Sequence, residues 1–390
     1  MSNRRLRAGW TFLLSLCLTS AVFSDESNGI VREISISGNL RTQTDVIRRE
    51  VLFQPGEPLT SDLVEETLRN LRALLFLGEV RLDVVRDGDY ADVLIRVEEL
   101  YSRAVTPLLS GKPGELSYGA VGLDYNFLGR GQIVELTAEH DAITGNRFRA
   151  FFREPRVSGS RVRVDVDAEL ASEGHRVVLS ASRPFFRLSE RRSLRVSGFS
   201  QESISRLYSS QDLIEKYSNR IRGGSASLSH SFGDDVKARP GVFLSVSDRN
   251  FTAETVFTTS PADRRRVLPS AGLTLWKPKY ETTRFFRHLG RTEDLQTGSW
   301  ATARVGVSAE GIGSDRDYRF ATIDLNPRFK PTEKSYLLMR FTYRSRFSDG
   351  RVWNAFGSAE ATFLAQILDI HAFAARIRWD GLGRTEDFSQ

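Results

Sequence analysis

The sequence predicts a small α+β domain followed by an all-β antiparallel transmembrane barrel. Three observations divide the 390 residues in this way. A basic and then apolar stretch opens the chain, strand and helix patterns follow up to residue 100, and a period-two alternation of apolar and polar residues continues to the end. With 40% hydrophobic and 27% charged residues, the chain is too polar for a bundle of membrane-spanning helices.

Residues 1–24 have the pattern of a secretory signal peptide. Three arginines precede an apolar run that ends at Phe23, and small residues stand near the expected cleavage point before Asp25. A membrane anchor is the alternative, but the run is near the lower limit for crossing a bilayer. The chain's one cysteine, Cys17, lies in this leader, so we expect the exported part to contain neither disulfides nor thiolate ligands.

The formal net charge of +6 is a weak clue to an anionic partner. Removing the three leader arginines from the 55 basic residues leaves 52 against 49 acidic ones, and the two kinds interleave along the chain. A nucleic-acid-binding protein would concentrate its positive charge on one stretch. We therefore expect no nucleic-acid partner.

Residues 25–100 are expected to form the α+β domain, in the order strand, helix, helix, strand, strand (βααββ). Alternation over residues 30–37 predicts the first strand, which ends in a turn. Thr44 is the expected N-cap of a short helix through Leu52, and Thr60 that of a second helix. Apolar residues then alternate along two closing strands, at Val80, Leu82 and Val84 and again at Val93, Ile95 and Val97.

This segment contains an ordered set of motif residues: Gly38, Asn39, Gly56, Leu71, Phe76 and Val80. In this order they resemble a polypeptide-transport-associated (POTRA) domain. The resemblance implies an exposed sheet edge beside the second helix, where a strand of an unfolded client polypeptide could be added. A generic α/β domain without a client is the alternative.

Residues 101–390 are expected to form the barrel, with roughly 12 to 14 strands by the period-two criterion. In residues 161–170 every even position is apolar and every odd position is charged, which fits one face toward lipid and one toward a wet lumen. Aromatic residues near strand ends, among them Phe185, Phe186 and Trp276, are expected in interfacial girdles. Longer links such as 201–218 and 250–266 are expected to be outer loops. A soluble propeller or solenoid is the alternative, but the sequence shows no fixed repeat.

Three turn motifs follow one another in this region: Asn126, Phe127, Leu128, Gly129 and Gly131, then Glu154 and Pro155, then Arg183 and Pro184. They resemble the turn motifs of the outer-membrane assembly superfamily, which includes BamA, TamA and the two-partner secretion transporters. The glycines permit the backbone conformations of a tight turn.

Two departures from the family pattern concern the lumen loop and the last strand. The nearest match to the family's lumen-loop motif, residues 221–224, lacks the aromatic residue and comes early. The chain also ends at Gln390 without a closing strand that has a terminal aromatic residue. The resemblance therefore implies either a barrel that is incomplete at its C-terminus or a diverged member of the family.

The sequence indicates no enzyme, metal site or cofactor. The five histidines are scattered, and no pair has ligand spacing. The adjacent carboxylates Glu65 and Glu66 are expected on a solvated surface.

Together the resemblances imply a protein of the outer membrane, in contact with its lipid bilayer and with the POTRA domain in the periplasm. They imply that it assists the insertion or translocation of unfolded client polypeptides, with periplasmic accessory proteins as further partners. The first barrel strand, near residues 101–110 and containing Pro107, would part from the last strand to receive client strands. A dedicated secretion pore of the two-partner type and a structural barrel without a client remain the alternatives.

Overall fold

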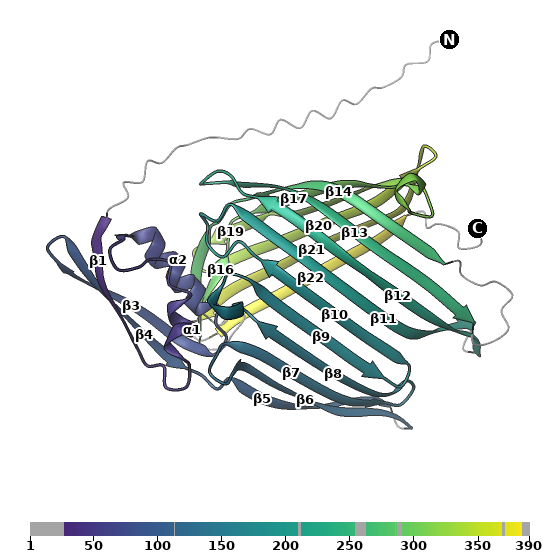
Figure 1. Ribbon diagram of the computed structural model, residues 1–390, viewed down its shortest axis with the longest axis horizontal. Helices are drawn as coiled ribbons and strands as arrows, with labels where there is room; N and C mark the ends of the chain where they lie inside the picture. The colour runs from purple at the N-terminus through teal and green to yellow at the C-terminus, as the bar shows by residue number, and fades with distance from the viewer. Residues whose placement is uncertain are drawn as a thin grey trace, which may run out of the picture.

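The computed structural model describes residues 27–112, 114–209, 212–253, 263–284, 286, 291–368 and 371–383. The predicted signal peptide with Cys17, and the last seven residues, lie outside the described residues. The described chain forms a small domain that sits at one end of a large curved sheet (Figure 1). No helix in these ranges is long and apolar enough to cross a membrane.

The N-terminal domain has two helices on one face of a four-stranded sheet. Its elements are β1 (Ser27–Ser37), α1 (Thr44–Arg48), β2 (Pro58–Thr60), α2 (Ser61–Arg72), β3 (Leu77–Asp87) and β4 (Tyr90–Glu99). The strand order is β2-β1-β4-β3, with β1 and β4 parallel. The predicted βααββ order therefore lacks one element, because the three-residue strand β2 pairs with β1 before the second helix.

Local sequence accounts for both helices of this domain. The Thr60 hydroxyl accepts a hydrogen bond from the Leu63 N–H (3.3 Å) and caps α2 as expected. The N-cap of α1, in contrast, is Gln43, so the prediction of Thr44 was wrong. The Thr44 hydroxyl instead accepts a hydrogen bond from the Asn39 amide (3.1 Å). The helix also ends at Arg48, four residues earlier than expected.

Alternating apolar residues build the core of the N-terminal domain. Leu71, Phe76 and Val80 are buried in this core. On β3 the side chains of Leu82 and Val84 also pack against it. The helices cover only this face of the sheet, and Figure 1 shows them between the sheet and the barrel. The opposite face of the sheet is therefore directed away from the barrel.

The large sheet is an antiparallel meander. Its strands are β5 (Arg103–Lys112), β6 (Glu115–Phe127), β7 (Gln132–Asp141), β8 (Gly145–Glu154), β9 (Arg163–Ala171), β10 (Gly174–Arg183), β11 (Arg192–Ser209), β12 (Asp212–His230), β13 (Lys237–Ala253), β14 (Arg264–Trp276), β17 (Trp300–Ser308), β18 (Tyr318–Asn326), β19 (Arg328–Thr332), β20 (Ser335–Ser348), β21 (Arg351–Leu368) and β22 (His371–Gly383). A separate hairpin, β15 (Tyr280–Arg284) with β16 (Thr292–Gln296), connects β14 to β17. Two short 3-10 helices occupy Val157–Gly159 and Glu310–Ile312.

The first and last strands of this sheet are both edges. Of its sixteen strands β19 lies off the path, which leaves fifteen in succession, each antiparallel to the next. An odd number of alternating strands makes β5 and β22 run in the same direction. Within the described ranges neither pairs with the other. Pro107 lies on β5, at an edge, where a strand tolerates a missing donor.

The two faces of the sheet differ as the alternation predicted. On one face arginines and carboxylates form ion pairs across neighbouring strands, such as Arg149 with Asp167 (2.8 Å) and Arg153 with Asp165 (2.6 Å). On the other face apolar side chains are exposed, including the directly paired Phe148 and Leu170. This is the arrangement of a barrel with a polar lumen and a lipid-facing wall.

The lengths of the connections differ from the expectation. The predicted loop 201–218 is wrong, because β11 continues to residue 209 and β12 starts at residue 212. Only residues 210 and 211 of this segment lie outside the described strands. The link 250–266 is also strand at both ends, and residues 254–262 lie outside the described ranges. The long connection is that between β14 and β17, on the side of the N-terminal domain.

Candidate functional site

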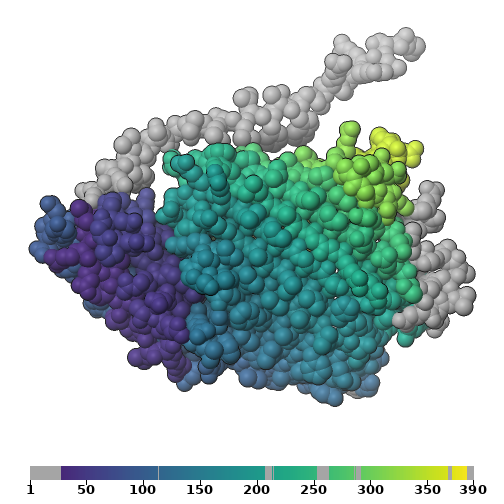
Figure 2. Space-filling view, in the orientation of Figure 1, coloured from purple at the N-terminus to yellow at the C-terminus, as the bar shows by residue number. Residues whose placement is uncertain are grey.

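The N-terminal domain and the barrel meet along a broad junction. Figure 2 shows the purple surface of the domain directly against the teal surface at the end of the sheet. The contacts come from three turns, β6–β7, β8–β9 and β10–β11, and from the β15–β16 hairpin. Three of the predicted turn motifs thus lie on the side of the barrel that faces the domain.

Asn126 both closes its own turn and binds the domain. Its side-chain carbonyl accepts a hydrogen bond from the Gly131 N–H (2.7 Å), while its amide donates to the Thr42 hydroxyl (2.8 Å). Asn126 and Thr42 are both buried. One side chain therefore fixes the turn conformation and holds it against the segment that precedes α1.

The two motif glycines lie where the domain comes closest. Gly129 and Gly131 have φ values of +70° and +68°, in the left-handed region. A Cβ atom would lie 2.2 Å from the Arg41 carbonyl oxygen at Gly129 and 2.8 Å from Arg49 Nη2 at Gly131. The Gly129 carbonyl in turn accepts a hydrogen bond from the Gln43 N–H (2.9 Å). Backbone conformation and close approach to the domain both require glycine here.

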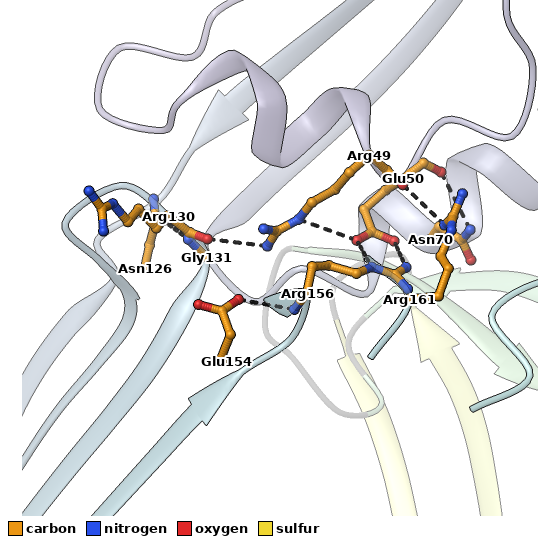
Figure 3. A network of polar contacts seen from close by, with 9 residues as sticks. All are labelled: Arg49, Glu50, Asn70, Asn126, Arg130, Gly131, Glu154, Arg156 and Arg161. Atoms are coloured by element: carbon orange, nitrogen blue, oxygen red, sulfur yellow. Dashed lines mark hydrogen bonds and ion pairs between the residues drawn. The ribbon is translucent and has the colours of Figure 1, made fainter. Parts of the chain in front are cut away.

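A buried ion pair lies at the centre of the junction. Arg156, which follows the Glu154-Pro155 motif, donates to both carboxylate oxygens of Glu50 at 2.8 and 3.2 Å. The two side chains are only 8% and 10% exposed. Figure 3 shows this pair beside Arg49, which donates to the Arg130 carbonyl (3.2 Å). Burial lowers the pKa of Arg49.

Glu154 holds the turn that carries this pair. One of its oxygens accepts a hydrogen bond from the Gln132 amide (2.6 Å), and the other accepts one from the Arg156 N–H (3.0 Å). Pro155 lies between them and is half-buried. The motif thus positions Arg156, which itself makes the contact with the domain.

The ring of Phe186 contacts three arginines at the junction. The Arg161 guanidinium stacks 3.8 Å from its centroid, and those of Arg156 and Arg187 lie within 6 Å. Arg161 also donates to the Arg49 carbonyl (3.3 Å). The sequence predicts an interfacial girdle for Phe186, and the structure places its ring against arginines of the junction.

Helix α2 makes the second half of the junction. Arg72 forms an ion pair with Asp294 on β16 (3.0 Å), with both side chains 12% exposed. Arg291 donates to the carbonyls of Arg72, Leu74 and Leu75 at the end of the helix. Such donation satisfies carbonyl groups that lack partners within the helix.

Glu66 contacts the barrel instead of lying on a solvated surface. Its carboxylate accepts a hydrogen bond from the Leu188 N–H in the β10–β11 turn. Burial raises the pKa of Glu66, although that hydrogen bond acts in the opposite direction. The sequence-based expectation for Glu66 was wrong, since nothing local in the chain marks it as half-buried.

Among the described residues, the hydrogen bonds and ion pairs of the remaining motif residues lie within their own part of the protein. A Cβ atom at Gly38 would lie 1.9 Å from the Val97 carbonyl oxygen, and the Asn39 amide donates to the Thr42 carbonyl (3.0 Å). Gly56 occupies an open turn with φ of +88°. Leu71, Phe76 and Val80 lie in the domain core, whereas Phe127 and Leu128 are exposed. Arg183 pairs with Glu190 in its own turn (3.4 Å), and Pro184 is half-buried.

The outer strand of the domain sheet has a free edge. Strand β3 has eleven residues and pairs with β4 alone in the described chain. At the opposite edge, β2 has only three residues. Arg81, Asp83 and Val85 on β3 are exposed on the face that the helices leave uncovered. The longer edge, β3, directly follows the second helix.

The described residues contain no group of three or more histidine, cysteine, aspartate or glutamate side chains that could hold a metal ion. The junction instead combines arginines, carboxylates and backbone groups in pairs. This arrangement is suited to holding the N-terminal domain against the barrel.

Comparisons with known proteins agree with both parts of the fold. Residues 29–100 match the POTRA family, described as a surface antigen variable number repeat. A curated protein of Treponema pallidum, described as an outer membrane protein assembly factor, is 32% identical over 117 residues, which are 28% of this chain and 14% of that protein. The match thus spans about one seventh of the relative's length.

Solved structures resemble nearly the whole chain. CdiB from Escherichia coli aligns with 91% of this chain and 66% of its own, at 12% identity and a TM-score of 0.52. BamA from Haemophilus ducreyi lacking POTRA domains 1-3 aligns with 91% of this chain and 72% of its own, at 14% identity and a TM-score of 0.42. The likeness to CdiB shows a shared fold.

Proposed function

Because residues 29–100 form a POTRA domain and the chain resembles the BamA/TamA-like superfamily, we propose that it assists the insertion or translocation of unfolded polypeptides at the outer membrane. The POTRA domain then lies in the periplasm. The main support for this proposal is the free edge of β3, in a domain that is held against the turns at one end of the barrel.

The proposed step at the POTRA domain is the addition of a strand. A free edge presents unpaired N–H and C=O groups, which can pair with an extended segment of another chain whatever its sequence. The exposed side chains beside this edge include Val85 and the charged Arg81 and Asp83. Such a surface suits transient capture of many clients, because backbone pairing supplies the affinity.

The proposed step at the barrel uses its two edges. Because β5 and β22 run in the same direction, one client strand antiparallel to both would pair with each of them. Pro107 removes one backbone donor from β5. Each of these steps is backbone pairing and requires no covalent chemistry, so we propose no enzymatic activity.

A secretion pore is the second candidate function. The charged face with its ion pairs would line a polar lumen, which a conduit requires. The fold likeness to CdiB is compatible with this alternative. A barrel that only has a structural role is the third.

Reconstitution separates the three functions. The full-length protein is placed in liposomes, and the folding of an unfolded model barrel is followed by its shift in gel mobility, with empty liposomes as the control. Our proposal predicts faster folding in the presence of the protein. Ion conductance without faster folding would favour the pore, and neither activity would favour the structural role.

A further inference from the structure

A cavity of about 400 Å³ lies between helix α2, the β10–β11 turn and the β15–β16 hairpin. We call it the junction pocket. Its lining residues used below are Glu66, Arg69, Phe185, Arg239, Trp276 and Tyr280. Exposed Ala73 and Arg187 stand among the other residues of its wall, so the pocket opens to the aqueous side of the junction. The pocket has the size of a small-ligand site.

Two arginines in the pocket stack on aromatic rings. The Arg239 guanidinium lies 4.1 Å from the ring centroid of Phe185 and 4.4 Å from that of Trp276. The Arg69 guanidinium lies 4.7 Å from the centroid of Tyr280. Stacking uses the face of a guanidinium and leaves its in-plane N–H groups for acceptors. In Arg239 the Nε–H group donates to the Ser231 hydroxyl (3.3 Å), so the Nη groups are the ones left for a ligand. The rings of Phe185 and Trp276, for which the sequence predicts an interfacial girdle, thus contact Arg239 in this pocket.

The pocket has more positive than negative charge. Five arginines line it, at positions 69, 72, 187, 239 and 291, against the three carboxylates of Glu66, Glu293 and Asp294. Asp294 is paired with Arg72, and Glu66 accepts from the Leu188 N–H. In the described chain no carboxylate lies within ion-pair distance of Arg69, Arg187 or Arg239.

Within the part of the chain that the structure describes, two buried donors in the pocket wall lack a partner, Nε of Arg72 and Nε of Arg291, and so does one buried acceptor, Oδ2 of Asp294. Arg291 is 8% exposed, and its Nη atoms donate to carbonyls of α2. Its Nε has no hydrogen-bond partner among the described residues. A buried donor of this kind costs free energy unless an acceptor reaches it.

We propose that the junction pocket binds a carboxylate that carries an aromatic or aliphatic group, as an unfolded client polypeptide presents it. This inference rests on the proposed function. Guanidinium groups bind carboxylates through two parallel hydrogen bonds, and the rings of Phe185, Trp276 and Tyr280 offer an apolar wall beside them. The three carboxylates of the wall disfavour a ligand with several negative charges.

The pocket lies between the POTRA domain and the barrel, so a bound ligand can contact both. Arg69 belongs to the POTRA domain, whereas Arg239 belongs to barrel strand β13. A carboxylate held by both would add a contact between the two parts. Client capture would thereby tighten the junction.

Calorimetry on the full-length protein in detergent micelles tests the pocket. Three probes are compared: a short peptide that ends in phenylalanine with a free carboxylate, the same peptide as its C-terminal amide, and that amide with an internal glutamate beside the phenylalanine. The first or the third is expected to bind at least about tenfold more tightly than the simple amide. Which of the two does so identifies the chain terminus or an acidic side chain as the source of the carboxylate.

Variants locate the binding. Arg69→Gln and Arg239→Gln are each expected to weaken binding by about tenfold or more, while Arg81→Gln on the far face of the domain leaves it unchanged. Arg239→Lys, which keeps the charge without the planar fork, is expected to bind with intermediate strength. Equal affinity for all three peptides, equally tight binding of inorganic phosphate, or full binding by both glutamine variants would overturn the proposal.

The liposome assay keeps this inference separate from the proposed function. Faster folding of the model barrel without peptide binding would contradict the proposed role of the junction pocket and would still support the proposed function. Peptide binding without faster folding would contradict the function instead, and would leave a carboxylate site on a protein with another role.

Discussion

Arg156 on the β8–β9 turn and Glu50 after helix α1 form a buried ion pair, with Nη2 and Oε2 2.8 Å apart. The two residues are 106 positions apart in the chain. Their pairing joins the POTRA domain to the barrel at a place where both side chains are largely buried. Removing a charged group from water is costly unless a partner compensates it. The pair therefore makes the docked arrangement specific.

Removal of either partner should loosen the junction. Glu50→Ala leaves the buried Arg156 guanidinium without its carboxylate, and such a loss costs about 3–5 kcal/mol. Arg156→Ala leaves Glu50 with the longer contact to Arg49 Nε (3.7 Å) and should cost less. Denaturant unfolding of the protein in micelles measures both changes. The double variant should be less destabilised than the sum of the two, because both single variants remove the same ion pair. The control Arg183→Ala removes an ion pair with a half-exposed arginine and should cost at most about 1 kcal/mol. Additive effects would contradict the pairing.

The glycine turn should depend on its contact with the domain. Gly129→Ala should destabilise the protein through backbone strain and through a clash with the Arg41 carbonyl. Gly350→Ala is a matched control, because Gly350 has φ of +69° and open space around it. Strain alone costs about 1–2 kcal/mol, and the overlap should add about 1–3 kcal/mol. Thermal unfolding compares them, and equal losses for the two variants would show that the domain does not press on this turn.

Glu66 should make the stability of the junction depend on pH. Burial raises its pKa, so the folded state binds this proton more tightly than the unfolded state does. The contribution of Glu66 is therefore most favourable at low pH. It declines as the pH rises through the ordinary glutamate pKa of about 4.3 and up to the raised value.

Glu66→Gln removes this titration while its amide oxygen can still accept from the Leu188 N–H. The variant should melt above the wild type at pH 7, and the difference should shrink as the pH falls. Glu65→Gln, at the exposed neighbouring position, should melt like the wild type at every pH. A wild type that melts above Glu66→Gln at pH 7 would contradict the burial effect.

Much of the fold follows from local patterns in the sequence. The alternation along β9 predicted its polar and apolar faces, because a strand places successive side chains on opposite sides. The Thr60 cap likewise depends on neighbours within one turn of the helix. The junction depends on long-range contacts: Glu50 and Arg156 each look like ordinary charged residues in the sequence. The residue after the Glu154-Pro155 motif was overlooked for that reason.

The two motif glycines show which structural requirements a sequence motif can predict and which it cannot. Gly129 and Gly131 were expected from the needs of a tight turn, and their positive φ values agree. Their second requirement, the approach of Arg41 and Arg49, could not be predicted without the docked domain. The contacts of Phe185 and Phe186 with arginines of the junction are equally long-range, because a strand-end aromatic residue by itself indicates only an interfacial position.

The edges β5 and β22 should accept a client strand and should not pair with each other. Val105 on β5 and Ile377 on β22 are 78% and 73% exposed. Cysteines at these positions, in a Cys17→Ser background, should form little disulfide in the reconstituted protein alone. Each should cross-link to a cysteine-bearing client strand during folding. Complete disulfide formation between Val105→Cys and Ile377→Cys without a client would contradict the open edges.

Capture of clients at the β3 edge is the central claim, and site-specific photo-cross-linking during liposome folding tests it most directly. A photoreactive residue replaces Val85, which is 62% exposed on β3, or Leu40, which is 92% exposed away from the sheet edge. We predict cross-links to the unfolded model barrel from position 85, which disappear once it has folded, and few from position 40. Faster folding of the model barrel with no cross-link at position 85, or with equal cross-linking at both positions, would contradict the claim.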